Sequence, residues 1–348
     1  METVRQIAQF VRWRDWGPGK LTILWSLCLY IAIAYELNFS SFILTSVIFL
    51  IFAATQSALG YVLNEWGDRE LDRRQFKHNS FTGKSSLECM LALTLILVAA
   101  AISGLPLALR PGFGMLWLAW AASAAAYSLE PFRLKTRGLV GLPVSFVAQW
   151  FLPVLITFAA FGVGGGRDMW LLALALTISG ATLEIGHQRF DRMRDMLTRA
   201  ATFAAGMQDV AIDRLYAAAL LLDKFSIGLV VALVVTRLAS LPARGALFLA
   251  ILLGSGYILL LFFTLGASIR ALRGGDLEDP YYSREPIIAR LLHETLLNFG
   301  VPLVLGIAAA LNDPYYAILL GVFLVWRVGL SRADWLWPLR AVRVKMNK

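Results

Sequence analysis

Long apolar runs recur along almost the whole chain, and polar residues gather between them. Each run is close to the roughly 20 residues that an α-helix needs to cross the hydrocarbon core of a membrane. The pattern predicts ten spanning helices, at residues 21–38, 41–63, 87–109, 112–129, 140–162, 169–188, 214–236, 244–266, 291–311 and 314–331. The expected fold is therefore all-α, a polytopic helical membrane bundle of about nine or ten transmembrane helices.

The polar stretches are too short to form a separate soluble domain, because the longest has only about 20 to 25 residues. We expect one membrane-embedded domain over residues 1–348, with an interfacial amphipathic segment at residues 1–20. The expected cytoplasmic loops are residues 64–86, 130–138, 187–213 and 267–290.

Composition and charge support this topology. Hydrophobic residues make up 58% of the chain and charged residues 16%, and the mean hydropathy is +0.67. Only four of the 32 Lys and Arg residues fall in the short loops, and most lie in the longer loops on the other side. The positive-inside rule then places both termini and the long loops in the cytoplasm. The net charge of +9 is explained by topology, so we expect a multi-pass membrane protein with no nucleic-acid partner.

Any metal site in this chain is expected to use oxygen ligands. The two cysteines, Cys28 and Cys89, lie inside apolar runs, so neither a disulfide framework nor a cysteine-rich metal site is available.

Two acidic segments follow the second and the sixth apolar runs. In the first, the residues that share one helix face are Asn64, Asp68 and Asp72. In the second, they are Glu184, Gln188, Asp191 and Asp195. Acids at a membrane edge are costly unless they are neutralised. Mg²⁺ prefers carboxylate and amide oxygens and often takes further ligands from phosphates. Two facing acidic segments therefore suit a site for a metal and a diphosphate.

Each segment taken alone is also typical of a solvated helix end held by salt bridges. Neighbouring arginines could neutralise it: Arg69, Arg73 and Arg74 in the first segment, and Arg189, Arg192 and Arg194 in the second. Both segments lie on the same predicted side of the membrane and repeat aspartate at positions i and i+4, which favours the shared metal site.

These residues resemble the motifs of the UbiA superfamily of membrane-embedded prenyltransferases. The family's N-D-x-x-D-x-x-x-D motif is similar to Asn64-Glu65-x-x-Asp68-x-x-x-Asp72, and its later D-x-x-x-D motif to Asp191-x-x-x-Asp195. Residues 127–138 resemble the family's basic loop. The chain departs from the pattern at Glu65, in lacking Arg-Pro after the first motif, and in its ten predicted spans where the family usually has nine.

The resemblance implies a helical bundle around a central lipid-open cavity. It also implies Mg²⁺-dependent transfer of a prenyl group from an isoprenyl diphosphate donor to a lipophilic or aromatic acceptor within the bilayer. The implied metal ligands are Asn64, Asp68, Asp72, Asp191 and Asp195, and the four aspartates are the implied catalytic residues. The candidate diphosphate-binding residues are Arg133, Lys135 and Arg137, which are equally explained as positive-inside residues. Acceptor identity and donor chain length stay open.

A charged pair, Asp223 and Lys224, falls inside the seventh predicted span, where both side chains should face protein or a wet cavity. Two interpretations stay open. The two charges neutralise each other as a structural pair, or the pair lines a cavity together with Glu184 and Gln188 and contacts the acceptor. Two alternative functions remain. One is a membrane terpene cyclase of the same superfamily, acting on an isoprenyl diphosphate without an acceptor. The other is a membrane transporter that uses the intramembrane pair.

Overall fold

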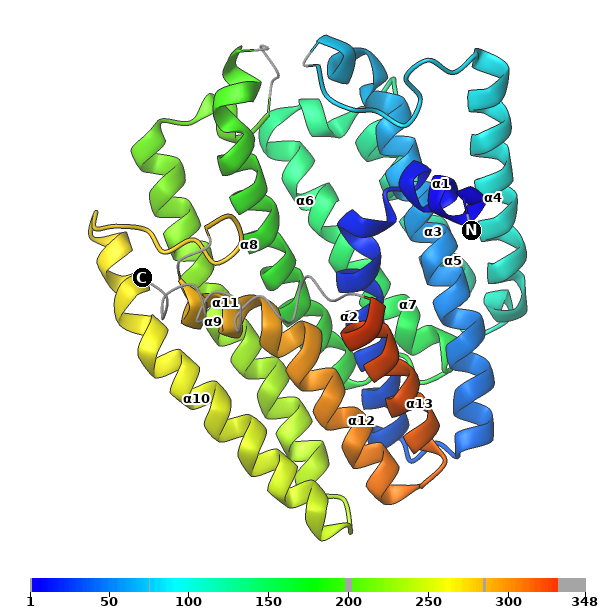
Figure 1. Ribbon diagram of the computed structural model, residues 1–348, viewed down its shortest axis with the longest axis vertical. Helices are drawn as coiled ribbons and strands as arrows, with labels where there is room; N and C mark the ends of the chain where they lie inside the picture. The colour runs from blue at the N-terminus through cyan, green and yellow to red at the C-terminus, as the bar shows by residue number, and fades with distance from the viewer. Residues whose placement is uncertain (1, 75, 198–201, 284–285, 331–348) are drawn as a thin grey trace. The chain divides into compact units, whose positions relative to one another are not determined.

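The computed structural model describes residues 2–74, 76–197, 202–283 and 286–330, and these residues are almost entirely helical (Figure 1). No β-strand occurs among them, so the predicted all-α class is confirmed. The first helices are α1 (Glu2–Phe10), α2 (Trp13–Ala34), α3 (Phe39–Arg74), α4 (Ser86–Ala108) and α5 (Phe113–Ser128).

Short helical turns at Leu134–Thr136 and Gly138–Val140 lead into one continuous helical stretch. This stretch contains α6 (Gly141–Phe146), a π-helical segment (Val147–Phe151) and α7 (Leu152–Ala160). It is followed by α8 (Arg167–Leu197), a short turn (Ala204–Gly206), α9 (Asp209–Ala239) and α10 (Arg244–Leu272). The last described helices are α11 (Ile287–Arg290), a π-helix (Leu291–Gly300), α12 (Val301–Asn312), α13 (Tyr316–Leu324) and a π-helical end (Val325–Leu330).

Each of the ten predicted spans is helical over most of its described length, although residues 35–38, the end of the first one, lie between α2 and α3. Residue 331, the end of the last one, lies outside the described residues. Eight described helices are long and apolar enough to cross a membrane. The fourth and tenth predicted spans are shorter helices, α5 with 16 residues and Tyr316–Arg327. Residues 64–74 and 187–197, expected in loops, are helical, because α3 and α8 continue past their apolar runs.

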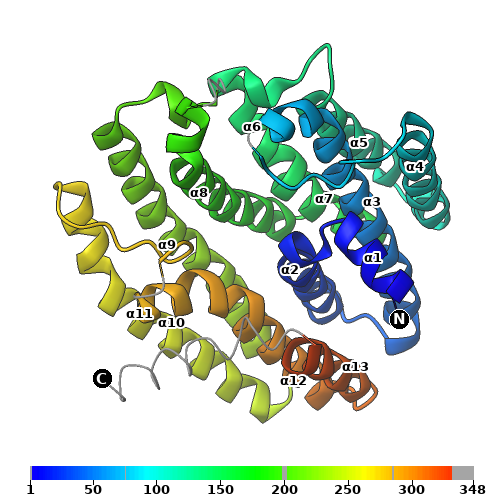
Figure 2. The ribbon, with the colours of Figure 1, turned by 45° about the horizontal axis from the view of Figure 1, so that its top comes forward.

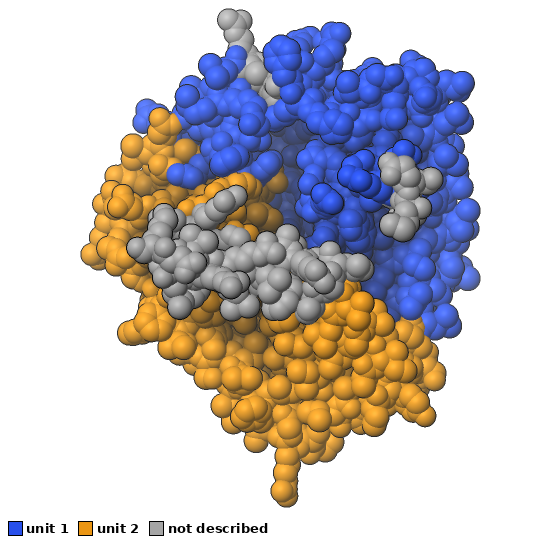
Figure 3. Space-filling model, viewed as in Figure 1, with its two compact units in different colours: residues 1–24, 44–173, 187–208 blue, residues 25–43, 174–186, 209–348 orange. Residues whose placement is uncertain are grey.

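The chain divides into two compact units (Figure 3). Unit 1 comprises residues 1–24, 44–173 and 187–208, and unit 2 comprises residues 25–43, 174–186 and 209–348. The expectation of one membrane-embedded domain therefore stays a prediction. Both acidic motifs, with the basic loop, belong to unit 1, and the Asp223–Lys224 pair belongs to unit 2.

Apolar packing in unit 1 joins the first motif helix to the N-terminal segment. A buried cluster is formed by Val62 of α3, Cys89 of α4 and Phe81, which lies between these two helices in the sequence. Phe10, at the end of α1, and Trp66 each contact the Phe81 ring edge-on with ring centroids 5.4 Å apart. Residues 2–20 of the segment expected to lie at the membrane interface form α1 and the start of α2, and apolar contacts connect α1 to α3. Their position at the interface stays a prediction.

In unit 2, α9 and α10 run side by side, joined by residues 240–243 (Figures 1 and 2). Many large apolar side chains of α10 are exposed, including Ile258, Phe262 and Phe263. A helix that is apolar on its exposed face is typical of contact with lipid, because hydrocarbon carries no penalty for such a surface.

Candidate functional site

Two side chains of the first motif share one cationic partner. Asn64 and Asp68 lie one turn apart on α3, and the Lys135 ammonium approaches both of them. Its Nζ lies 2.6 Å from Asp68 Oδ1 and donates a hydrogen bond to Asn64 Oδ1 at 2.8 Å. The Arg133 guanidinium also reaches Asp68 Oδ1, at 3.4 Å from Nη2. An amide oxygen and a carboxylate oxygen therefore converge on one positive charge.

Burial affects two cationic side chains of the basic loop, Lys135 and Arg133. Burial lowers the pKa of the Lys135 ammonium below its ordinary value, although the nearby Asp68 carboxylate opposes the shift. Arg133 Nε is buried, and among the described residues it has no hydrogen-bond partner. A buried N–H without an acceptor is unfavourable, so this atom is suited to an oxygen supplied by a ligand.

Two glycines allow the basic loop to lie close to the first motif. A Cβ atom on Gly67 would lie 2.2 Å from the carbonyl oxygen of Ser128, at the end of α5. One on Gly141, at the start of α6, would lie 2.6 Å from the Leu134 carbonyl oxygen. Neither position has space for a side chain, because the atom in the way is backbone. Glycine in the middle of the first motif thus permits the close approach that brings Lys135 to Asn64 and Asp68.

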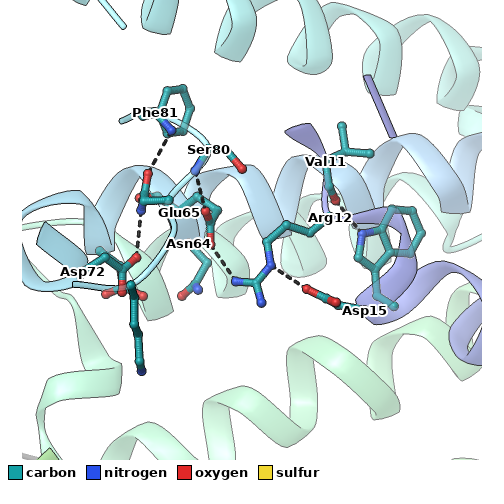
Figure 4. Close-up of polar contacts among 12 residues, drawn as sticks. Val11, Arg12, Asp15, Asn64, Glu65, Asp72, Ser80 and Phe81 are labelled. Carbon is teal, nitrogen blue, oxygen red and sulfur yellow. Dashed lines mark hydrogen bonds and ion pairs between the residues drawn. The ribbon is translucent and has the colours of Figure 1, made fainter. Parts of the chain in front are cut away.

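Asp72 and Glu65 are both buried, and both contact the segment that follows α3 (Figure 4). Asn79 donates to Asp72 Oδ2 at 2.8 Å. One Glu65 oxygen accepts a hydrogen bond from Arg12 Nη1 at 2.7 Å, and the other accepts one from the Ser80 backbone N–H at 2.9 Å. The two oxygens of Glu65 are thus engaged away from Lys135, and we do not count Glu65 among the candidate metal ligands.

The second motif lies on α8 and faces a lysine from the segment after α3. Asp191 Oδ2 is 3.6 Å from Lys77 Nζ, and Asp191 Oδ1 accepts a hydrogen bond from Arg194 at 3.1 Å. Asp195 is buried and accepts a hydrogen bond from Thr202 at 3.0 Å. The positive charge of Lys77 also attracts Asp72 and Asp195. Lys77 therefore lies among carboxylates of both motifs.

Sequence reasoning did not select Lys77. It noted this segment only for lacking Arg-Pro, although a lysine five residues after Asp72 was the available signal. Arg137, a predicted phosphate ligand, is not brought to the motifs. It is exposed and donates to the Pro131 carbonyl oxygen at 2.8 Å. Glu184 and Gln188 are half-buried on α8, before the second motif.

A second polar cluster lies inside unit 2 and is centred on Asp223. One Asp223 oxygen is 2.5 Å from His293 Nδ1, and the other accepts hydrogen bonds from Ser179 at 2.5 Å and Ser226 at 3.0 Å. The Tyr281 hydroxyl donates to Asp223 at 3.3 Å. Burial raises the pKa of Tyr281 well above its ordinary value, which keeps this donor protonated. Asp223 is thus surrounded by donors.

Lys224 joins the same cluster through the histidine. Lys224 Nζ is 2.8 Å from His293 Nε2. If His293 Nδ1 carries the proton donated to Asp223, Nε2 has a lone pair and accepts from the ammonium. This assignment follows from the hydrogen-bond network. His293 was not selected from the sequence. Here it is buried and connects Asp223 to Lys224.

The donor set of unit 1 fits a hydrated divalent cation. Within the described ranges, no three His, Cys, Asp or Glu side chains gather closely enough to hold a metal by themselves. Asn64 and Asp68 nonetheless direct two oxygens at one cation, Lys135. A hard cation that keeps several waters and takes other ligands from phosphate needs only one or two carboxylates from the protein.

The fold and the site define the class of this protein as a helical membrane protein with two acidic motifs and a basic loop. The model of the UbiA prenyltransferase family matches residues 21–278. The chain belongs to the UbiA prenyltransferase family and is a multi-pass membrane protein. A search of curated proteins finds no match.

Two solved structures of a UbiA homolog from Archaeoglobus fulgidus are similar to this chain. The structure bound to DMAPP and Mg²⁺ has 16% sequence identity and a TM-score of 0.50, over 85% of this chain and 98% of that one. The structure bound to GPP and Mg²⁺ has 15% identity and a TM-score of 0.52, over 90% of this chain and 99% of that one. At this identity the similarity concerns the fold.

The Gly67 contact predicts a stability difference between two glycines of α3. Gly67→Ala should lower the free energy of unfolding by about 1–3 kcal/mol, because the new methyl group overlaps the Ser128 carbonyl. Gly60→Ala is the matched control, since its Cβ would lie 3.8 Å from the Ala124 methyl, an ordinary contact. Alanine favours a helix over glycine by roughly 1 kcal/mol, so the control should be neutral or stabilising. Thermal unfolding in detergent measures both variants, and equal unfolding temperatures would contradict the packing argument.

Proposed function

We propose that this protein is a Mg²⁺-dependent prenyltransferase. It transfers a prenyl group from an isoprenyl diphosphate to a lipophilic or aromatic acceptor within the membrane. The observation that carries the proposal is the convergence of Asn64 and Asp68 on one positive charge, beside the unsatisfied Nε of Arg133. Oxygen ligands for a metal next to donors for an anion are what a metal diphosphate requires. Family membership supports the same reaction class.

The metal ligands in this proposal are Asn64, Asp68, Asp72, Asp191 and Asp195, bound directly or through water. When bound, Mg²⁺ neutralises the developing charge of the diphosphate leaving group. The carboxylates supply the negative charge that attracts the ion. Two of these carboxylates already attract a cationic side chain: Asp68 lies 2.6 Å from Lys135 Nζ, and Asp191 lies 3.6 Å from Lys77 Nζ.

The diphosphate-binding residues in this proposal are Arg133 and Lys135, and the structure adds Lys77 as a candidate. Arg133 offers a planar set of N–H donors that suits phosphate oxygens, while each lysine offers a compact positive charge. Arg137 remains a weaker proposal, because it is exposed and bonded to the Pro131 carbonyl.

The proposed reaction exchanges one bond for another at the first carbon of the prenyl chain. The bond from this carbon to the diphosphate oxygen breaks, and its electron pair leaves with the diphosphate. An electron pair of the acceptor forms the new bond, and the acceptor loses a proton to a base. We propose Asp223, Lys224, Glu184 and Gln188 for the acceptor side. Asp223 already accepts several hydrogen bonds, whereas the one partner described for Lys224 Nζ is His293. Lys224 is therefore the better candidate to contact an acceptor oxygen.

We also propose that both termini and the acidic motifs face the cytoplasm of a bacterial or archaeal cell. The orientation is supported by the concentration of Lys and Arg in the longer connections.

Release of diphosphate tests the reaction. Purified protein is incubated with dimethylallyl, geranyl, farnesyl or geranylgeranyl diphosphate, with Mg²⁺ or EDTA, and with or without a membrane-lipid extract as a source of acceptor. We expect release that needs both Mg²⁺ and the extract. Release without the extract would instead support the cyclase alternative. Absence of release from every donor would contradict prenyl transfer and favour the transporter.

Removing one charge from each motif tests the metal assignment. Asp68→Asn and Asp191→Asn should each lower the rate of diphosphate release by about 100-fold or more, because an amide neutralises a cation poorly. Asp276→Asn, in an exposed loop residue of the same type, is the control and should behave as wild type. Unfolding temperatures are measured for all three variants. Wild-type rates in both motif variants would overturn the assignment.

The acceptor assignment is tested at Lys224. Lys224→Met removes the ammonium while keeping a long apolar side chain. We expect the KM for the acceptor to rise about 10-fold or more, the effect of losing a hydrogen bond to a charged group. The KM for the donor should change less than about 2-fold, because the proposed diphosphate ligands are untouched. An unchanged acceptor KM in a folded variant would remove Lys224 from the acceptor side.

A further inference from the structure

Glu65 contacts two segments that lie outside its own helix. It occupies the second position of the first motif, and it is 2% exposed. Arg12, which lies between α1 and α2, donates to one carboxylate oxygen, and the backbone N–H of Ser80 donates to the other (Figure 4). One buried side chain of α3 therefore holds both the N-terminal segment and the segment that follows α3.

The segment that follows α3 is fixed along its length by further contacts with the same helix. The Asn79 amide donates to the Glu65 carbonyl oxygen and to Asp72 Oδ2, each at 2.8 Å. The backbone N–H of Lys77 donates to the Asp72 carbonyl oxygen at 3.0 Å. The Phe81 ring is held between Phe10 and Trp66. Hydrogen bonds and ring contacts thus hold residues 77–81 against α3.

Lys77 is the residue of this segment that faces the second motif. Its Nζ lies 3.6 Å from Asp191 Oδ2. The position of a long, flexible lysine side chain depends on where its backbone is held, and here the backbone is held by Asp72, Asn79 and Glu65. Removing the Glu65 carboxylate would leave the Ser80 N–H without its acceptor and would release the Arg12 guanidinium. Both losses loosen the segment that carries Lys77.

We propose that Glu65 is a positioning residue for the diphosphate site. It fastens residues 77–81 to α3, so that Lys77 is held among the carboxylates of both motifs. This inference rests on the proposed function, in which Lys77 binds the diphosphate. Glu65 itself acts through Lys77 and touches neither metal nor substrate.

A double-mutant cycle in the full-length protein tests the proposal. The variants are Glu65→Ala, Lys77→Ala and the double variant, and the probe is inorganic diphosphate with Mg²⁺, titrated by calorimetry. We expect each single variant to weaken the Kd about 10-fold and the double variant to be no weaker than Lys77→Ala. Glu65→Gln, which keeps an oxygen acceptor for the Ser80 N–H, should recover part of the affinity. Effects that multiply in the double variant would overturn the proposal, because Glu65 would then act independently of Lys77.

Hydrogen exchange at the Ser80 amide gives a second readout that needs no ligand. We expect faster exchange in Glu65→Ala and wild-type exchange in Glu70→Ala, the matched control for an exposed glutamate of the same helix. Unchanged exchange in Glu65→Ala would overturn the fastening. Absence of diphosphate binding by the wild-type protein would contradict the proposed function, and the exchange rates would still decide whether Glu65 holds the segment. Should Glu65→Ala fail to fold, Glu65→Met, which keeps a long side chain but offers no oxygen acceptor, carries both measurements.

Discussion

A carboxylate at the edge of a membrane needs a positive charge or hydrogen-bond donors nearby, and this requirement organises the protein. The cost of desolvating an acid is high unless a partner compensates for it. Asp68 has Lys135 and Arg133, Asp191 has Lys77 and Arg194, and the buried Asp223 has His293 and two serine hydroxyls. The same pairings bring the proposed metal ligands next to the proposed diphosphate-binding residues, so the contacts that stabilise the acids also assemble the proposed site.

Close backbone packing makes these pairings possible. At Gly67 and Gly141, backbone atoms of the chain around the basic loop come so close that no side chain would fit. The loop then presents Lys135 to α3, while Arg133 keeps a buried N–H that only a further acceptor can satisfy. The proposed site is therefore formed by acidic residues of α3 and α8 and by cationic side chains of the connecting segments. Such an arrangement suits an anionic ligand, because the helices supply the proposed metal ligands and the connecting segments supply the cationic side chains.

Glu65 illustrates how a departure from a family pattern is resolved by structure. From the sequence, a glutamate at this position could be read as a metal ligand with a longer arm. The structure directs that arm to Arg12 and to the Ser80 N–H. Lys77 and His293 show the complementary case, since neither was selected from the sequence and both lie at the centre of a polar cluster.

The sequence by itself determined the helical membrane class, the positions of the helices and the spacing of acids on α3 and α8. These features are local, because apolar runs and steps of three or four residues fix which side chains share a helix face. Only the tertiary structure decided which cation meets which acid. Lys135 is 71 residues from Asn64, and His293 is 70 residues from Asp223. Such pairings depend on how whole helices and loops pack, and no local pattern carries that information. The tertiary structure therefore turned a row of acidic residues into a site with assigned partners.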